Sequence, residues 1–303
     1  MLMMPGRRQR RVSWWAVGFI LPAVILFGLF VLLPIVVALG LSFVSWPGVG
    51  QIHFAGFAKW IELFHDSTAA AALGRTGVVV AASWVIQEPI ACALGIFAAG
   101  RQRYRTVLSS VYFLPLLISG AGIGIMWANL LSPIGGGIQY AGAHFGLGFL
   151  NHEWLANPQL TLPTVVVLVA WEFIPFHTLL YQAGTKQIPS VLYEAASIDG
   201  IGPVGKVRFI TLPMLKNTIV TSTVLNVVGS LTVFDLIYTL TGGGPGESTR
   251  VFSIDQYIVG FGEQHFGYAS VLAVTLGIIG IGVSLVLIRI TGFGKMRSQG
   301  EGA

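Results

Sequence analysis

The sequence predicts an all-α integral membrane protein with six transmembrane helices, and three observations carry that prediction. Only 10% of the 303 residues are charged and 54% are hydrophobic, whereas about 25% of the residues of a soluble domain are charged. The mean hydropathy is +0.78. Apolar stretches that could cross a bilayer core of about 30 Å, which takes roughly 20 helical residues, recur along the chain.

Six apolar segments meet this length. They are Trp14–Val44, Thr76–Ala98, Thr106–Leu131, Leu162–Thr185, Met214–Leu240 and Tyr268–Ile290. The first follows a run of arginines, as in a signal peptide, but it is too long and lacks a clear small-x-small cleavage site. We therefore predict an uncleaved anchor, with residues 1–13 as a basic N-terminus, 14–290 as the transmembrane domain and 291–303 as a tail.

Basic residues indicate how these segments are oriented. With the N-terminus in the cytoplasm, 14 of the 17 lysines and arginines fall on the cytoplasmic side, and only Lys59, Arg75 and Arg250 fall on or near the other. The positive-inside rule predicts this asymmetry, so we expect both termini in the cytoplasm. The net charge of +5 then reflects topology, and no nucleic-acid partner is predicted.

Metal and disulfide chemistry find little support in the composition. The single cysteine, Cys92, excludes an internal disulfide and a multi-cysteine metal site, and it is interpreted as a small packing residue. His144, His152 and His265 are scattered over outer loops without metal-ligand spacing. No catalytic residues and no metal site are therefore predicted.

The longest cytoplasmic connection, residues 186–216, contains a predicted short helix. Ser190 is expected to cap its N-terminus, VLYEAASID to form about two and a half turns, and Gly200 to end it in the left-handed conformation. The following GIGPVGKV is close to the phosphate-binding pattern G-x-x-x-x-G-K-[ST]. It follows a helix instead of a strand and has Val207 where a hydroxyl is needed, so it is interpreted as a turn.

This loop resembles the cytoplasmic signature of binding-protein-dependent ABC importer permeases, in which EAA, Gly and I-x-L-P stand at fixed spacing. The matching residues are Glu194, Ala195, Ala196, Gly200, Ile210, Leu212 and Pro213. WLANP (154–158), FDLIYTLTGGGP (234–245) and GYASVLAVTLGIIG (from Gly267) are similar to the carbohydrate-uptake, MalF-like branch of the family. Arg75 departs from the pattern, because relatives often carry Asn there.

The resemblance implies a type I ABC importer permease fold and a non-enzymatic subunit in the inner (plasma) membrane of a bacterium. A second permease, two ABC ATPase subunits and an extracytoplasmic solute-binding lipoprotein would be its partners. ATP and Mg²⁺ would bind the ATPase subunits, and this chain would bind no cofactor.

The same resemblance makes the short helix the contact to the ATPase. Glu194 and Asp199 would make polar contacts, Ala195 and Ala196 would pack closely, and Gly200 would turn the chain away. A helix resting on lipid headgroups is the alternative, but such a helix carries basic residues on its polar face, and this one is acidic.

Solute-facing residues follow from the same alignment. They are Glu172, Phe173, Phe176, Asn226, Ser230 and Val233. Glu172 lies deep in the fourth segment, where an acid costs at least about 2.5 kcal/mol unless it meets a cavity or a partner. Alternatives stay open: Glu172 could pair with His177 or with a basic group elsewhere, and Asn226 and Ser230 could form hydrogen bonds to a partner permease. For the polar Gln87–Glu88–Pro89 segment, a structural role is at least as plausible as solute contact.

The predicted function is import of a sugar or related polar solute driven by ATP hydrolysis in the partner subunits. Glycerol-3-phosphate or glycerophosphodiesters are alternative solutes, because LFHDS (63–67) and EAASIDGIGP also resemble that branch. A proton-coupled secondary carrier, suggested by Glu88, Glu172 and Asp235 in the membrane, is the alternative of another class. A membrane hydrolase would need clustered acid–base or metal ligands, which the sequence does not offer.

Overall fold

The computed structural model describes residues 14–100, 102–150 and 152–291, and these are almost entirely helical. The two strands that it contains, β1 (Val44–Ser45) and β2 (His53–Phe54), pair antiparallel in one hairpin. The basic N-terminus predicted at 1–13 and all of the predicted tail after Thr291 lie outside the described residues. The prediction of a mostly helical membrane protein is confirmed.

Fifteen α-helices are described, linked by loops and short π- and 3₁₀-helical turns. They are α1 (Trp14–Phe27), α2 (Leu33–Leu41), α3 (Ala58–His65), α4 (Ser67–Ala98), α5 (Arg103–Tyr112), α6 (Gly120–Leu130), α7 (Gly137–His144), α8 (Pro158–Lys186), α9 (Ser190–Ile198), α10 (Pro203–Lys206), α11 (Leu212–Met214), α12 (Lys216–Leu231), α13 (Asp235–Thr241), α14 (Phe252–Tyr257) and α15 (Phe266–Thr291).

Four helical stretches are long and apolar enough to cross a membrane, and they coincide with four of the predicted segments. These are Gly18–Leu41, Ser67–Ala98, Pro158–Lys186 and Phe266–Ile290. Helices α12 and α13, which meet at a bend of 42°, make a fifth candidate span when they are taken together. The part of the chain that the structure describes therefore holds four or five candidate spans.

The predicted third segment, Thr106–Leu131, is not one continuous helix. Helix α5 ends at Tyr112, a 3₁₀ turn covers Leu114–Leu117, and α6 begins only at Gly120. Pro115 lacks an N–H group and disfavours helical geometry in the residue before it. Ser119 then starts a new helix by accepting a hydrogen bond from the Gly122 N–H at 3.2 Å. The interruption thus has a local cause in the sequence.

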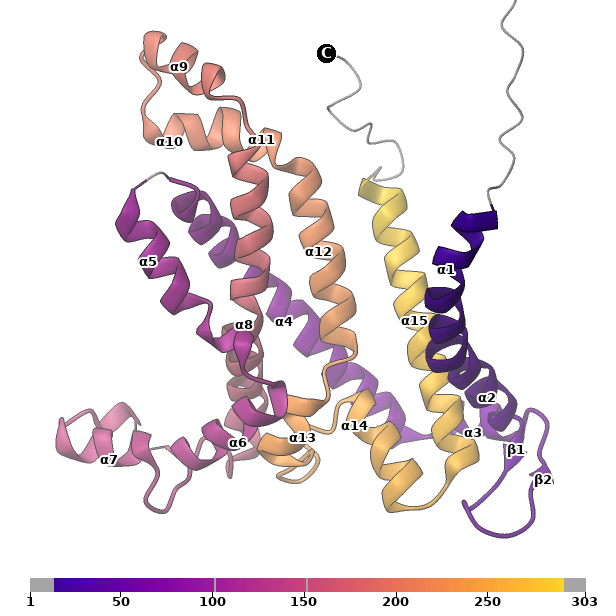
Figure 1. Cartoon of the computed structure of the whole chain (residues 1–303). Coiled ribbons are helices and arrows are strands. Elements are labelled where there is room, and N and C mark those ends of the chain that lie inside the picture. Colours follow the sequence, from indigo (N-terminus) through magenta and orange to yellow (C-terminus); the bar gives the residue numbers. More distant parts are fainter. Residues whose placement is uncertain (1–13, 101, 151, 292–303) are drawn as a thin grey trace, which may run out of the picture.

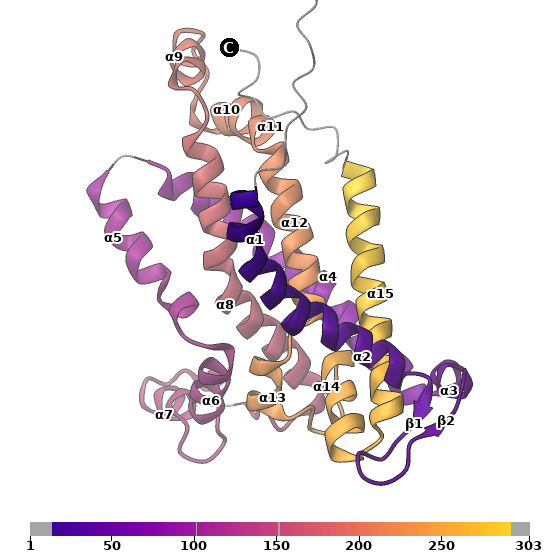
Figure 2. The same ribbon diagram turned by 45° about the vertical axis from the view of Figure 1, so that its right-hand side comes forward.

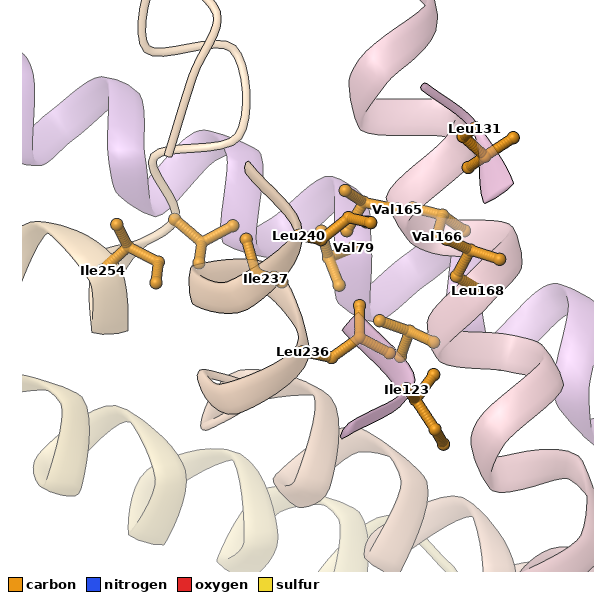
Figure 3. Close-up of a cluster of buried hydrophobic side chains, with 12 residues drawn as sticks. Val79, Ile123, Leu131, Val165, Val166, Leu168, Leu236, Ile237, Leu240 and Ile254 are labelled. Carbon is orange, nitrogen blue, oxygen red and sulfur yellow. The ribbon is translucent and has the colours of Figure 1, made fainter. Parts of the chain in front are cut away.

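Helices α4, α8 and α12 form the centre of the molecule (Figures 1 and 2). Helix α4 packs against both α8 and α12, α13 packs against α6, and α15 packs against α2. Buried side chains from α4, α6, α8 and α13 meet in one apolar cluster, which Figure 3 shows around Val79, Ile123, Val165 and Leu236. The two ends of the molecule differ: α9, α10 and α11 lie at one, and the β-hairpin, α7 and α14 lie at the other (Figure 1).

Gly95 is the point of closest approach between α4 and α8. A Cβ atom at this position would lie 2.9 Å from both the Gln182 nitrogen and the Thr178 carbonyl oxygen, and closer still to the Tyr181 side chain. Since the obstructing atoms include backbone, they cannot move without separating the helices. Small residues at such crossings let membrane helices approach closely.

Replacing Gly95 with alanine should therefore destabilise the protein. We expect the free energy of unfolding to fall by about 1–3 kcal/mol, because an extra methyl group overpacks a close contact. Thermal unfolding of the purified transporter would measure this. Gly74 lies on the same helix with open space around it, so Gly74→Ala is the matched control. Equal unfolding temperatures for the two variants would contradict the prediction.

Arg75, the departure from the family pattern, binds the loop before α14. Its Nη1 donates to the Arg250 carbonyl oxygen at 3.1 Å, and the neighbouring Thr76 hydroxyl accepts from the Phe252 N–H at 2.9 Å. Arg250 also pairs with the buried Asp255 at 2.7 Å. Burial raises the pKa of the Asp255 carboxyl, and the Arg250 guanidinium acts against that rise. Arg75 and Thr76 together thus hold residues 250–252 against α4.

Candidate functional site

A cavity of about 350 Å³ lies between α4, α8, α12 and the 3₁₀ turn. Its lining comprises Gln87, Leu116, Val169, Phe173, Phe176, His177, Leu225, Asn226, Val228, Gly229, Ser230 and Val233. Five of the six residues predicted to face the solute are in this set: Phe173, Phe176, Asn226, Ser230 and Val233. Helical spacing brings Phe173 and Phe176 together on α8, and Asn226 and Ser230 on α12, because positions three or four apart share a helix face. Val233 follows in the break after α12.

Glu172 does not line this cavity. Its buried side chain points toward the start of α6, where a Cβ atom on Gly120 would lie 3.1 Å from Glu172 Oε1 and 3.5 Å from Asp235 Cβ. The Glu172 Oε2 atom has no hydrogen-bond partner among the described residues. The side chain therefore lies beside the α6–α13 contact instead of beside Phe173 and Phe176. His177, the partner considered for it, is hydrogen-bonded elsewhere.

Two amide side chains supply polar groups at the cavity wall. Asn226 Nδ2 on α12 donates to Gln87 Oε1 on α4 at 2.8 Å. Each amide keeps one buried atom for which the described chain provides no partner: Gln87 Nε2, a donor, and Asn226 Oδ1, an acceptor. A buried unpartnered polar atom costs about 1–3 kcal/mol. Both atoms are covered in this structure, so a solute hydroxyl, which can donate and accept at once, would satisfy this pair after the two amides turn toward the cavity.

His177 reaches the cavity from a second polar network, which joins α4, α8 and α12. Glu88 accepts hydrogen bonds from the Tyr181 hydroxyl and, at 2.9 Å, from the Ser222 hydroxyl. Ser222 also contacts His177 Nδ1 at 2.8 Å. Because Ser222 has one hydrogen and directs it at Glu88, the bridging hydrogen of the second bond belongs to His177 Nδ1. If the His177 ring is neutral, its other nitrogen, Nε2, carries no hydrogen and can only accept a hydrogen bond.

The lining as a whole is uncharged and partly aromatic. Among the described residues, no lysine, arginine, aspartate or glutamate lines the cavity. The lining contains the polar side chains of Gln87, His177, Asn226 and Ser230 together with the rings of Phe173 and Phe176. Sequence reasoning noted Gln87 as polar at depth, but it did not place Gln87 or His177 at the cavity. The signal was present in both cases, as a polar residue within an apolar segment.

The predicted short helix is α9, which projects at the end of the molecule with α10 and α11 (Figure 1). Gly200 follows it with φ of +75°, as predicted. The Ile201 N–H bonds to the Ala196 carbonyl at 2.8 Å and the Gly200 N–H to the Ser197 carbonyl at 3.2 Å. This pair of bonds is the Schellman motif, which needs a residue free to adopt positive φ. The prediction that Ser190 caps the helix is wrong, because Pro189 occupies the N-cap position and Ser190 is the first helical residue.

Helix α9 is fixed to its own chain on one side and open on the other. Tyr193 and Thr211 share a hydroxyl hydrogen bond of 2.9 Å, and Lys206 Nζ donates to Ser197 Oγ at 2.6 Å. Ala196, predicted to pack on the ATPase, is only 4% exposed and packs within this chain. The other predicted contact residues, Glu194, Ala195, Asp199 and Gly200, are exposed. Ile198 is 88% exposed on the same open side.

The glycine-rich stretch after α9 forms no phosphate-binding loop. Residues 201–202 link α9 to α10, which begins at Pro203 and continues into a π-helical turn at Val207–Thr211. A phosphate-binding loop would follow a buried strand, and the strands of the described chain lie in the hairpin at the opposite end. Its interpretation as a turn is consistent with this geometry.

The family follows from comparison with known proteins. The family described as "Binding-protein-dependent transport system inner membrane component" matches residues 91–292, two thirds of the chain, including the cavity residues on α8 and α12 and the whole of α9. This chain belongs to that family. It is a multi-pass inner-membrane permease of an ABC transport system, and a permease component of this kind carries no catalytic site.

Two relatives and one solved structure agree with this family. A probable ABC transporter permease protein of Pyrococcus horikoshii is 31% identical over 272 residues, covering 88% of this permease and 92% of the relative. A diacetylchitobiose uptake system permease protein of Streptomyces coelicolor is 28% identical over 319 residues, covering 96% and 88%. A chain of a bacterial alginate ABC transporter has the same fold, with a TM-score of 0.80 and 22% identity over 92% of this permease and 94% of that chain.

Proposed function

We propose that this permease imports a sugar or a related neutral polyol through the cavity between α4, α8 and α12. The observation that carries the proposal is an uncharged lining that combines aromatic rings with unpartnered donor and acceptor atoms. Sugars offer apolar ring faces and many hydroxyl groups, each of which can donate and accept at once. The diacetylchitobiose permease relative supports a carbohydrate solute.

The uncharged lining also favours a neutral solute over glycerol-3-phosphate. Phosphate recognition relies on arginine, lysine or backbone N–H groups at a helix N-terminus. The described cavity lining provides neither of the two cationic residues. A phosphate dianion inside this cavity would be left largely without partners, at a high desolvation cost. Phosphorylated solutes are therefore the weaker candidates.

Six membrane passes with both termini in the cytoplasm belong to the same proposal. Counting α5, the 3₁₀ turn and α6 as one broken pass would add a sixth to the five candidate spans obtained when α12 and α13 are taken together. Of the ten lysines and arginines in the described ranges, seven lie at the α9 end and only Lys59, Arg75 and Arg250 lie at the other. The positive-inside rule then makes the α9 end cytoplasmic.

The transporter would be completed by a second permease, two ABC ATPase subunits and an extracytoplasmic solute-binding protein. Helix α9 would dock on an ATPase subunit through Glu194, Ala195 and Asp199, with Gly200 turning the chain away. ATP and Mg²⁺ would bind the ATPase subunits. Closure of those subunits would pull α9 and its counterpart in the second permease together and tilt the spans so that the cavity opens outward. ATP hydrolysis would then restore the inward-facing state.

Replacing Asn226 or Gln87 with alanine tests the cavity directly. Because each change removes a neutral hydrogen bond to the solute, worth about 1.4 kcal/mol, uptake at low solute concentration should fall about tenfold. The measurement is ATP-dependent uptake of labelled sugar into vesicles that contain the complete transporter.

Asn217 provides the matched control, since it lies exposed on the same helix and outside the cavity. Asn217→Ala should leave uptake unchanged. The proposal of a sugar cavity fails if Asn226→Ala and Gln87→Ala transport every tested sugar as the unchanged protein does. Uptake that survives ATP depletion but stops with an uncoupler would instead favour the proton-coupled carrier.

A further inference from the structure

A second, polar pocket of about 200 Å³ lies away from the proposed solute cavity, at the end of the molecule opposite α9. It is formed by the connection between α6 and α8, which includes α7. Besides Trp154, whose indole N–H is bonded to the Leu150 carbonyl oxygen, four of its lining side chains can form hydrogen bonds: Ser132, Gln139, His152 and Glu153. Among the described residues, its lining contains no lysine or arginine. It therefore offers hydrogen-bonding groups together with one acidic side chain.

An apolar groove of about 270 Å³ continues from this pocket. The two share Leu131, Ile138, Leu150 and Trp154 in their linings. The groove runs on along the first turns of α8, past Leu160, Pro163 and Val167. Pocket and groove thus form one site that is polar at one end and apolar at the other. A soluble sugar would fill only the polar end, whereas a lipid matches both.

The surroundings place this site at a membrane boundary. Figure 1 shows α7 extending sideways from the bundle, next to the start of the long membrane helix α8. Tyr140 and Phe145 near α7 are 64% and 76% exposed, and Trp127 and Trp154 line the groove. Tyrosine and tryptophan concentrate where hydrocarbon meets headgroups. A lipid headgroup at this level would lie beside the polar pocket and its acyl chain beside the groove.

We infer that this site binds a zwitterionic phospholipid with a primary amine in its headgroup. The ammonium group would pair with the Glu153 carboxylate, and the Gln139 amide would donate a hydrogen bond to the phosphate. One acyl chain would lie in the groove against Val167 and Pro163. Glu153 would repel a purely anionic lipid, since no lysine or arginine lines the pocket in the described chain to compensate. The inference does not depend on which solute the transporter carries.

Lipid retention by the complete transporter tests this inference. The transporter would be purified into nanodiscs of mixed phosphatidylethanolamine and phosphatidylglycerol, and the lipids that remain after stripping would be identified by mass spectrometry. The unchanged protein should retain phosphatidylethanolamine. Val167→Trp fills the groove and should lower that retention about tenfold, the change expected when roughly two methylene groups lose contact. Glu153→Lys should shift the preference to phosphatidylglycerol.

Val78→Trp is the matched control, because Val78 is similarly exposed on α4 and lines neither the pocket nor the groove. It should retain lipid as the unchanged protein does. Equal retention by Val167→Trp and Val78→Trp would overturn the inference, as would an unchanged lipid preference in Glu153→Lys. Cross-linking of position 167 to the second permease would overturn it too, because the groove would then be a subunit interface.

Discussion

Reversing the charge of Glu194 should lower ATP-dependent uptake by at least about 100-fold, the largest functional loss that we expect from any single exposed residue. Glu194 lies exposed on the open side of α9, and its side chain makes no hydrogen bond or ion pair with the rest of the described chain. Glu194→Lys should therefore leave the permease folded and inserted. The loss should arise at the ATPase contact, where a basic partner would face a new positive charge. Uptake into vesicles and ATP hydrolysis stimulated by the binding protein would be measured together.

Two companion variants separate docking from folding. Glu194→Gln keeps the size of the side chain and removes only its charge, so it should retain a larger share of the uptake than Glu194→Lys. Ala196→Leu should act differently, because Ala196 is buried within the chain and a larger side chain there lowers thermal stability. If Glu194→Lys transports normally while it assembles with the ATPase, the proposed role of α9 is wrong.

Local chemistry explains why α9 could be predicted closely from the sequence. The end of this nine-residue amphipathic helix is determined by residues that are close in sequence. The hydrogen bonds from the Gly200 and Ile201 N–H groups reach back no more than five residues. The broken third segment was within reach for the same reason, since Pro115 marks the break. An average over about twenty apolar residues hides such a single position, so the hydropathy alone suggested one continuous helix.

The cavity depended on information that one sequence does not contain. Spacing on α12 correctly grouped Asn226 and Ser230, because those positions share a helix face, and Val233 lines the same cavity from the break after α12. Pairing of Gln87 with Asn226 joins residues 139 apart, and no local pattern specifies it. Glu172 shows the same limit. Its depth was clear from the sequence, but the side of α8 that it occupies depends on how α6 and α13 pack there.

Among the buried residues, we expect Glu88 to give the largest loss of stability when it is replaced. It belongs to the polar network that joins α4, α8 and α12. Glu88→Ala removes the acceptor for both Tyr181 and Ser222, so that the Tyr181 hydroxyl loses its partner and Ser222 keeps only His177. Interhelical hydrogen bonds in membranes contribute about 0.6 to 1.7 kcal/mol each. We therefore expect the free energy of unfolding to fall by about 2 kcal/mol and uptake to fall with it. Thermal unfolding of the transporter and sugar uptake are the two measurements.

Glu88→Gln distinguishes a positioning role for Glu88 from mere packing. Glutamine can still accept from Tyr181, but its Nε2 group must donate to Ser222, whose own hydrogen then turns toward His177 Nδ1. The ring hydrogen of His177 would move to Nε2, so that a donor replaces the acceptor at the cavity. Stability should stay near that of the unchanged protein while the KM for uptake rises, and the ¹⁵N resonances of His177 should report the new tautomer.

In a His177→Ala background the Glu88→Gln change should have no further effect on KM. An equal rise in KM with and without His177 would show that Glu88 acts by another route.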